Sequence, residues 1–150
     1  MKFFWSYIFI SLGALHSQNI VEENGKFYED GRLFTGKIVE YRDNIIRKEI
    51  LITKGQIHKN IRFYHSNAQL QEQGAYKRGK KDGLWEVWNK DGQKISEAWY
   101  FKGKKDNTWI IWDDNGVKRC EMHYDKGKKV GVWKRWGDKS DLISQKSYES

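Results

Sequence analysis

Hydrophobic residues recur along this chain in short aromatic and β-branched runs that are separated by Gly-containing turns. Runs such as LWEVW at 84–88 and KISEAWYF at 94–101 have the length and composition of β-strands. No stretch places apolar residues at the i, i+3, i+4 spacing of an amphipathic helix over a sufficient length. The segments NKDG and DDNG predict tight hairpin turns, because Gly and Asn adopt positive φ at little cost. The pattern therefore predicts an antiparallel meander of roughly ten strands of ordinary length.

The turns and aromatic residues repeat with a period of 24 residues. The segment that starts at Tyr76 returns at Tyr100 and again at Tyr124, and a Tyr column, two Trp columns and two Gly columns keep the same register. The candidate repeat-turn glycines are Gly79, Gly83, Gly92, Gly103, Gly116 and Gly127. Degenerate copies extend the register toward the N-terminus. We therefore predict one repeat domain, residues 18–150, with units that start near residues 28, 52, 76, 100 and 124.

A single unit of this kind cannot bury its own aromatic residues, so neighbouring units must pack against one another. The predicted fold is an all-β repeat architecture in which an antiparallel hairpin meander forms one elongated twisted sheet. Alternation along a strand places Trp85 and Trp88 on opposite faces. Either a bulge or a strong twist brings both Trp columns into one core, or one column stays partly exposed.

The first residues, MKFFWSYIFISLGALHSQ, have a different pattern. One Lys precedes an apolar run from Phe3 to Leu15, and small and polar residues follow, as in a secretory signal peptide. The run is shorter than the roughly 20 apolar residues of a transmembrane helix. We expect residues 1–17 to be a signal peptide cleaved after Ser17, with an uncleaved anchor as the alternative. The sequence thus predicts export to the periplasm, the outer-membrane periphery or the extracellular space, with no transmembrane span in the mature chain.

Candidate catalytic and metal-binding residues are few. Beyond the signal segment the His residues are His58, His65 and His123, and none has a metal-ligand spacing. The single Cys120 cannot form an internal disulfide and is expected to be a half-buried strand residue. The Asp residues of the turns are explained by local capping of backbone groups. We therefore expect no enzymatic activity, no metal site and no cofactor.

Positive charge is concentrated in the repeats. The chain has 28 Lys and Arg and 20 Asp and Glu, and residues 76–136 contain sixteen of the basic and nine of the acidic residues. Stacked hairpins would place equivalent turns along one side, where such a basic ridge attracts anionic groups. The candidate ridge consists of Lys80, Lys81, Lys104, Lys105, Lys128 and Lys129. The alternative is a solvated edge on which Lys residues keep strands from aggregating.

Six Trp residues form two candidate aromatic columns. The first column contains Trp85, Trp109 and Trp133, and the second contains Trp88, Trp112 and Trp136. Exposed rings could stack on sugars or hold an apolar partner segment. Buried rings would instead form the core of a repeat that is poor in Leu and Val. The sequence leaves both interpretations open.

The segment YKRGKKDGLWEVWNKDGQKISEAWYFKGKKDNTWIIWDDNG resembles the bacterial variant of the MORN repeat. Its pattern is an aromatic residue, then Gly-Lys-x-x-Gly, then Trp-x-x-Trp or Tyr, then a turn Gly. The chain is similar in this respect to toxin–antitoxin system YwqK family antitoxins, strongly over 76–136 and weakly over 28–73. Asn107 and Lys59 replace the Gly of the second Gly column. Val130 replaces the Asp that precedes this Gly in the segment KKDG. The resemblance implies a scaffold or interaction module with links to membranes and protein partners.

These features predict an exported, non-enzymatic repeat scaffold that binds a protein partner in the cell envelope. One alternative is binding to an anionic membrane surface or an envelope glycan through the Lys-rich turns and Trp columns. Another alternative is an antitoxin-like inhibitor of one protein. Nucleic acid is not expected as a partner, because the chain carries an export signal.

Overall fold

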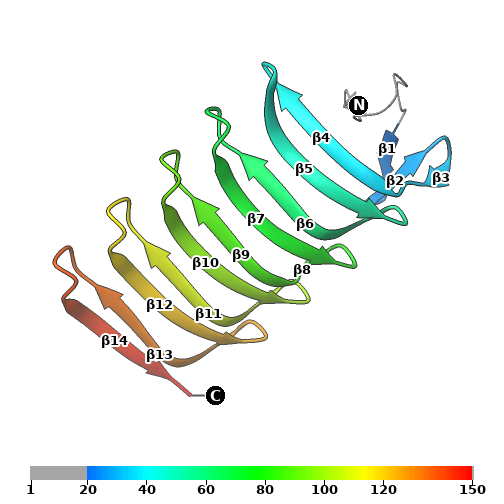
Figure 1. The fold of residues 1–150 in the computed structure, drawn as a ribbon. Coiled ribbons are helices and arrows are strands. Elements are labelled where there is room, and N and C mark those ends of the chain that lie inside the picture. Colours follow the sequence, from blue (N-terminus) through cyan, green and yellow to red (C-terminus); the bar gives the residue numbers. More distant parts are fainter. Residues whose placement is uncertain (1–19, 150) are drawn as a thin grey trace, which may run out of the picture.

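The computed structural model describes residues 20–149, so the expected signal peptide, residues 1–17, lies outside them. The described residues form fourteen β-strands. Ten of them follow one another as hydrogen-bonded antiparallel neighbours in the main sheet, and β8 pairs with β7 beside this path (Figure 1). The main sheet contains β4 (Gly36–Arg42), β5 (Ile45–Thr53), β6 (Gln56–Tyr64), β7 (Leu70–Lys77), β8 (Lys80–Lys81), β9 (Gly83–Trp88), β10 (Lys94–Phe101), β11 (Lys104–Trp112), β12 (Lys118–Asp125), β13 (Lys128–Trp136) and β14 (Leu142–Tyr148).

The predicted all-β hairpin meander in an open twisted sheet is confirmed. Within residues 20–149 no helix is long and apolar enough to cross a membrane. One feature was not predicted: the first described residues do not join the main sheet. They form a second antiparallel sheet of β1 (Ile20–Glu23), β2 (Lys26–Glu29) and β3 (Arg32–Leu33).

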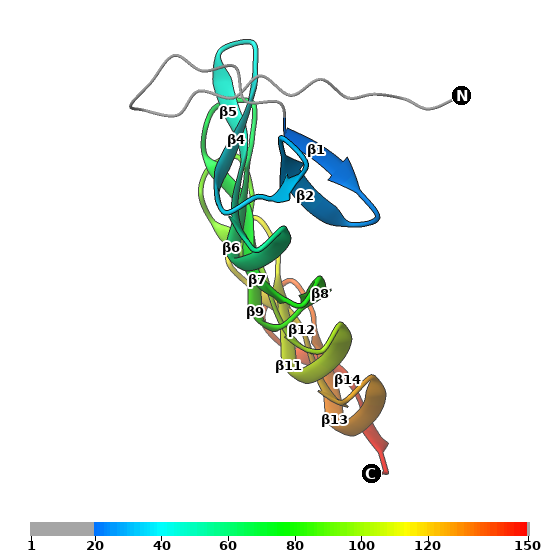
Figure 2. The same ribbon diagram turned by 90° about the vertical axis from the view of Figure 1, so that its right-hand side faces the viewer.

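The small sheet packs on one face of the main sheet at its N-terminal end. Figure 2 shows the main sheet edge-on as a single layer, with β1 and β2 on one side of it. Ile20, Phe27 and Phe34 are buried there with Ile residues of β4, β5 and β6. The Phe27 N–H also donates to the Gly55 carbonyl at 2.8 Å. The small sheet therefore caps the first hairpins of the stack.

Two kinds of turn join the strands of the main sheet. On one side lie two-residue turns in which both residues have positive φ, as in type I′ turns. These are Lys54–Gly55, Arg78–Gly79, Lys102–Gly103 and Lys126–Gly127, and we call them the basic turn row. On the other side, after the two-residue turn Asp43–Asn44 between β4 and β5, lie the five-residue turns 65–69, 89–93, 113–117 and 137–141, which we call the opposite turn row. NKDG and DDNG thus lie in hairpin turns as predicted, but the tighter turns are those of the Lys-Gly segments.

The hairpins bend just before the basic turn row because one strand of each pair carries extra residues. Between Ala98 and Tyr100 β10 advances by two residues, while the facing stretch of β11 runs from Lys105 to Trp109. The same irregularity recurs between β5 and β6 and between β12 and β13. Asn107, in this bulge, has a φ of 52°, which explains why Asn can replace Gly in this column. In Figure 2 the turn ends curl toward the side on which β1 and β2 lie.

The curled ends cover an aromatic ladder, and we call the side that carries it the ladder face. Neighbouring ring centroids in the ladder are 4.9 to 6.3 Å apart. The ladder runs through Tyr76, Trp85, Tyr100, Trp109, Tyr124, Trp133 and Tyr148. It continues the buried Ile residues of β4, β5 and β6. Trp85 is 2% exposed and lies so close to Gly74 that a Cβ there would be 2.2 Å from the indole.

The two Trp columns lie on opposite faces of the sheet. Trp85 belongs to the ladder face, and alternation along β9 directs Trp88 to the other side, which we call the outer face. The second column, Trp88, Trp112 and Trp136, is half-buried; in the first column Trp85 is buried, and Trp109 and Trp133 are half-buried as well. Of the two arrangements that the sequence left open, the structure therefore has the one in which a column stays partly exposed. The bulges bend the hairpins without bringing the columns together.

Candidate binding surface on the basic turn row

Hydrogen bonds between successive units hold the basic turn row together. The Lys102 N–H donates to Asp82 Oδ2 at 3.0 Å, and the Gly103 N–H donates to the Lys81 carbonyl at 2.8 Å. One unit later, Lys126 bonds Asp106 at 2.9 Å in the same way. Backbone donors that an isolated hairpin would leave to water are thus satisfied by the preceding unit. Equivalent turns are two strands apart, which is roughly 9.5 Å.

The second Lys of each KGKK segment lies over the aromatic ladder. The Nζ atoms of Lys81, Lys105 and Lys129 lie 3.5, 4.2 and 4.7 Å from the ring centroids of Trp85, Trp109 and Trp133. Each of these ammonium groups also lies 5.1 to 5.3 Å from the next Tyr ring of the ladder. Contacts of this kind contribute about 0.5–1 kcal/mol each at exposed sites. Half of the predicted basic ridge therefore also stabilises the fold.

The first Lys of each segment is exposed, as are Lys105 and Lys129 at the second position, whereas Lys81 is half-buried. A Cβ on Gly103 would lie 3.5 Å from the Cβ of Lys80, so this Lys stem runs along the next turn. Lys104 has the same relation to Gly127. Lys80, Lys104 and Lys128 form no ion pair with any side chain that the structure describes. Their ammonium groups lie over no aromatic ring of residues 20–149 and are therefore the part of the predicted ridge that the fold does not use.

A further basic column occupies the first residue of each two-residue turn. Lys54, Arg78, Lys102 and Lys126 have φ values between 46° and 53°. This left-handed conformation costs an ordinary L-residue roughly 1–2 kcal/mol, and Asn or Asp adopts it more readily. The other two-residue turns of this chain are Asn24–Gly25, Asp30–Gly31 and Asp43–Asn44. Turn geometry therefore does not require a basic residue in this column. The sequence signal is a Lys or Arg directly before the turn Gly; Arg78, Lys102 and Lys126 belong to the same Lys-rich clusters as the candidate ridge, but the ridge residues singled out from the sequence all follow the Gly.

Charge differs strongly between the two turn rows. Residues 76–83, 100–107 and 124–131, which contain three turns of the basic row, hold ten Lys and Arg and three Asp. The four opposite turns hold two Lys and five Asp. In the described part of the chain, the hydrogen-bonding edges of the main sheet are β4 and β14, whereas the basic turn row lies at the strand ends. Protection of a strand edge, the alternative role predicted for the Lys residues, therefore does not apply to this row.

The outer face next to the basic turn row carries two exposed aromatic side chains. Trp99 is 41% exposed and Phe101 is 39% exposed, and alternation along β10 directs both to the outer face. The Lys102 Nζ lies 4.9 Å from the Phe101 ring centroid. Neighbouring hairpins carry Ala75 with Lys77 and His123 with Asp125 at these positions. The aromatic pair is therefore specific to the hairpin of β10 and β11.

Ion pairs surround the second Trp column on the outer face. Lys94 bonds Glu86 at 2.5 Å and Glu97 at 2.7 Å, and its Nζ lies 5.8 Å from the Trp88 ring centroid. Partial burial raises the pKa of Glu86, but hydrogen bonds from Lys94 and Gln73 outweigh it and hold this pKa below its ordinary value. The charged groups beside the second column are thus already paired.

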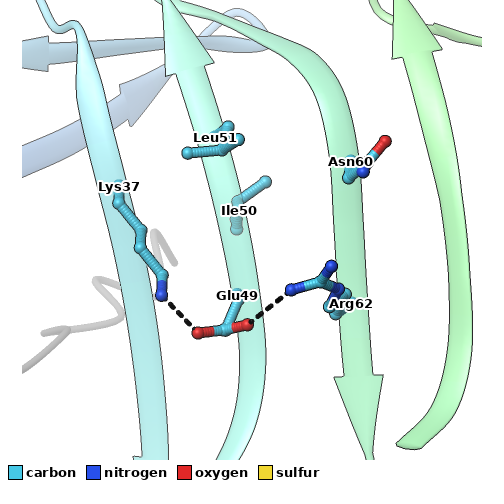
Figure 3. Close-up of a pocket in the computed structure, with 6 residues that line it drawn as sticks. All are labelled: Lys37, Glu49, Ile50, Leu51, Asn60 and Arg62. Atoms are coloured by element: carbon cyan, nitrogen blue, oxygen red, sulfur yellow. Dashed lines mark ion pairs between the residues drawn. The ribbon is translucent and has the colours of Figure 1, made fainter.

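A shallow hollow of about 150 Å³ lies on the outer face over β4, β5 and β6 (Figure 3). Its lining residues are Lys37, Glu49, Ile50, Leu51, Asn60 and Arg62. Glu49 lies between Lys37 and Arg62 and accepts the Tyr64 hydroxyl at 2.7 Å. Burial raises the pKa of Glu49, but these hydrogen bonds and charges lower it overall. The Glu49 carboxylate already satisfies the two basic side chains of the hollow, so an anionic ligand would have to displace it.

Metal and nucleophile chemistry has little support in the described residues. Among residues 20–149 no group of three or more His, Cys, Asp and Glu could hold a metal ion. Cys120 lies half-buried in β12, as predicted. His65 lies 2.8 Å from the Trp88 carbonyl, and His123 lies 3.3 Å from the Thr108 hydroxyl. Both imidazoles thus contact neighbouring strands.

The predicted site residues therefore separate into three groups. The ladder contains the first Trp column, the outer face carries the second, and the basic turn row carries the Lys residues. The six predicted repeat-turn glycines all have positive φ, from 73° at Gly79 to 97° at Gly127.

Comparison of the chain with protein-family models, with curated proteins and with solved structures finds no match in any of the three.

Proposed function

We propose that this protein is an exported, non-enzymatic repeat scaffold that binds a protein partner in the cell envelope through the basic turn row. The carrying observation is the basic residue at the left-handed position of all four turns in this row. Asn or Asp serves this position in the three other two-residue turns of the same chain. A position that is basic despite a conformational cost indicates a role outside the fold.

The rigidity of the row supports the same proposal. The turns Lys54–Gly55, Lys102–Gly103 and Lys126–Gly127 are each bonded to the preceding segment of the chain through two backbone N–H groups. A partner then meets charges that are already held at equal intervals, and little conformational entropy is lost on binding. Because several equivalent turns act together, weak contacts combine into useful affinity. The resemblance to MORN-type repeats also favours an interaction module, and the N-terminal segment favours export.

Substitution of the four turn residues tests the proposal. The variant Lys54→Asn, Arg78→Asn, Lys102→Asn and Lys126→Asn removes four charges and relieves the left-handed strain. We expect it to unfold at a higher urea concentration than the wild type, because Asn tolerates positive φ. We also expect it to lose its partner in crosslinking capture from an envelope extract. Opposite effects on stability and on binding separate a functional defect from misfolding.

A matched control removes charge from the opposite turn row. The variant Lys90→Asn and Lys139→Asn should keep the partner. Retention of one stoichiometric protein by the four-turn variant would contradict the role of the basic turn row and would favour the antitoxin-like alternative. Capture of anionic lipid or glycan alone, lost at high salt, would favour binding to an anionic envelope surface instead.

A further inference from the structure

We propose that the basic turn row recognises an acidic segment in polyproline II conformation, with an acidic residue at every third position, that lies across the hairpins. This inference rests on the proposed function and specifies the partner's chemistry. Three observations carry it: the spacing of the turns, the excess of positive charge along them and the aromatic pair at the hairpin of β10 and β11.

The spacing of the turns matches this conformation. Equivalent positions in successive hairpins are two strands apart, or roughly 9.5 Å. A polyproline II segment has three residues per turn at about 3.1 Å each, so its side chains repeat every 9.3 Å or so. Side chains on one face of a β-strand repeat about every 6.7 Å, and an α-helix has a pitch of about 5.4 Å. Of these three conformations, only polyproline II has a side-chain repeat that matches the spacing of the turns. A segment in this conformation therefore places one acidic residue beside each hairpin.

The charge along the row favours an acidic partner. Each turn of the KGKK type exposes two basic side chains, such as Lys102 with Lys104 and Lys126 with Lys128. The carboxylates of Asp82 and Asp106 accept the backbone N–H groups of Lys102 and Lys126 and are thus used inside the row. The Lys102 and Lys126 side chains are exposed, and the Lys126 Nζ lies 3.7 Å from the exposed Asp125 carboxylate. An acidic residue placed beside the turn at Arg78, Lys102 or Lys126 therefore meets a pair of cations, and beside the turn at Lys54, which is followed by Gln56, it meets one.

The aromatic pair supplies an anchor beside the third of the four turns, inside the row and not at its end. Trp99 and Phe101 lie on the hairpin of β10 and β11, between the hairpin that carries Arg78 and the one that carries Lys126. Exposed aromatic rings are the usual docking surface for polyproline II segments. Energetically dominant contacts also tend to lie near the centre of an interface, with charged contacts around them. We therefore expect Trp99 and Phe101 to contact the pyrrolidine rings of Pro residues that lie between two acidic residues of the segment.

Synthetic peptides test the register directly. The purified full-length protein is titrated with (Glu-Pro-Pro)n peptides, with n from one to six, and affinity is measured by isothermal titration calorimetry at low and moderate salt. For n of two, four and six, the control peptide is built from Glu-Glu-Pro-Pro-Pro-Pro blocks and has the same length, composition and charge but a different spacing. We expect affinity to rise with n, by up to about fivefold per matched Glu, and to level off near four.

The spaced peptide should bind at least tenfold more tightly than the control peptide at equal length. The variants Trp99→Ala and Phe101→Ala should weaken the spaced peptide more than the control, whereas Trp136→Ala should not. Equal affinity for the two peptides would overturn this inference and leave the proposed function intact, because net charge alone would then explain the binding. Binding to vesicles with anionic phospholipid, without binding to either peptide, would overturn this inference and also weigh against a protein partner.

Discussion

Removal of the Trp85 side chain should cost a large part of the stability of this sheet. Trp85 is 2% exposed, its ring meets Tyr76 edge-on at 5.3 Å, and its indole N–H donates to the Ala75 carbonyl at 3.1 Å. A buried Trp removes about 150–250 Å² from water, which at about 25 cal/mol per Å² is about 4–6 kcal/mol. Trp-to-Ala substitutions in cores cost about 3–5 kcal/mol, because the cavity relaxes only in part. We expect about 4 kcal/mol for Trp85→Ala.

This loss is large relative to what the fold can provide. At about 0.05–0.15 kcal/mol per residue, the 130 described residues would give roughly 6–20 kcal/mol. A single-layer sheet with few buried side chains belongs at the lower end of that range. Trp85 also lies between earlier and later hairpins. Since each unit contacts only its neighbours, its loss should uncouple the two parts, and unfolding should no longer occur in one transition.

The assay is urea-induced unfolding, followed by far-UV circular dichroism. Trp99→Ala is the matched control, because Trp99 is 41% exposed on the outer face. Its substitution should change the free energy of unfolding by less than about 1 kcal/mol. A Trp85→Ala loss below about 1 kcal/mol, or equal losses in the two variants, would refute the view that the ladder face is the core.

Two further predictions concern hydrogen bonds and pH. Asp106→Ala should destabilise the protein by about 1 kcal/mol in the same urea assay, because Asp106 accepts the Lys126 N–H at 2.9 Å. The control Asp91→Ala should have little effect. Equal effects of the two substitutions would contradict the hydrogen-bonded link between turns. The lowered pKa of Glu86 means that its carboxylate stabilises the fold above the unfolded-state pKa and that this contribution is lost as the pH falls through the folded-state pKa. The free energy of unfolding should therefore decrease between pH 6 and pH 3, and Glu86→Gln should reduce this dependence; an unchanged slope would assign it to other carboxylates.

The local elements could be predicted because their signals are local. A strand such as LWEVW is identified by composition, and a turn such as Lys102–Gly103 by its Gly, since both depend on residues that are adjacent in the chain. The period of 24 residues reappears in the structure as equivalent hydrogen bonds, including those that the Trp109 and Trp133 indoles donate to carbonyls ten residues earlier. Repetition itself predicted stacking, because one hairpin cannot cover its own rings.

The candidate site was predicted less completely, for a physical reason. That Asp82 serves the Lys102 N–H depends on a contact across two strands, which no local pattern displays. The basic residues at left-handed φ, such as Arg78, look like ordinary turn residues until the backbone is known. The separation of β1, β2 and β3 from the main sheet was likewise not predicted. The register reaches back to Gly31, and its turn forms, but Phe27 and Phe34 are buried against the ladder face instead of extending the main sheet.

The sequence by itself determined the strands, the turns, the repeat and the concentration of positive charge, because these follow from composition and spacing. Only the tertiary structure decided that Trp85 of the first column joins the core and that Trp109 packs against it, that the second column lies half-buried on the outer face, and that half of the candidate ridge Lys residues lie over aromatic rings. Burial of a ring depends on how far each hairpin bends, and the bend depends on bulges such as the one that contains Asn107. Asp106, the residue before Asn107, accepts the Lys126 N–H of the next unit, so the bend and the contact between units are visible only when the units are stacked.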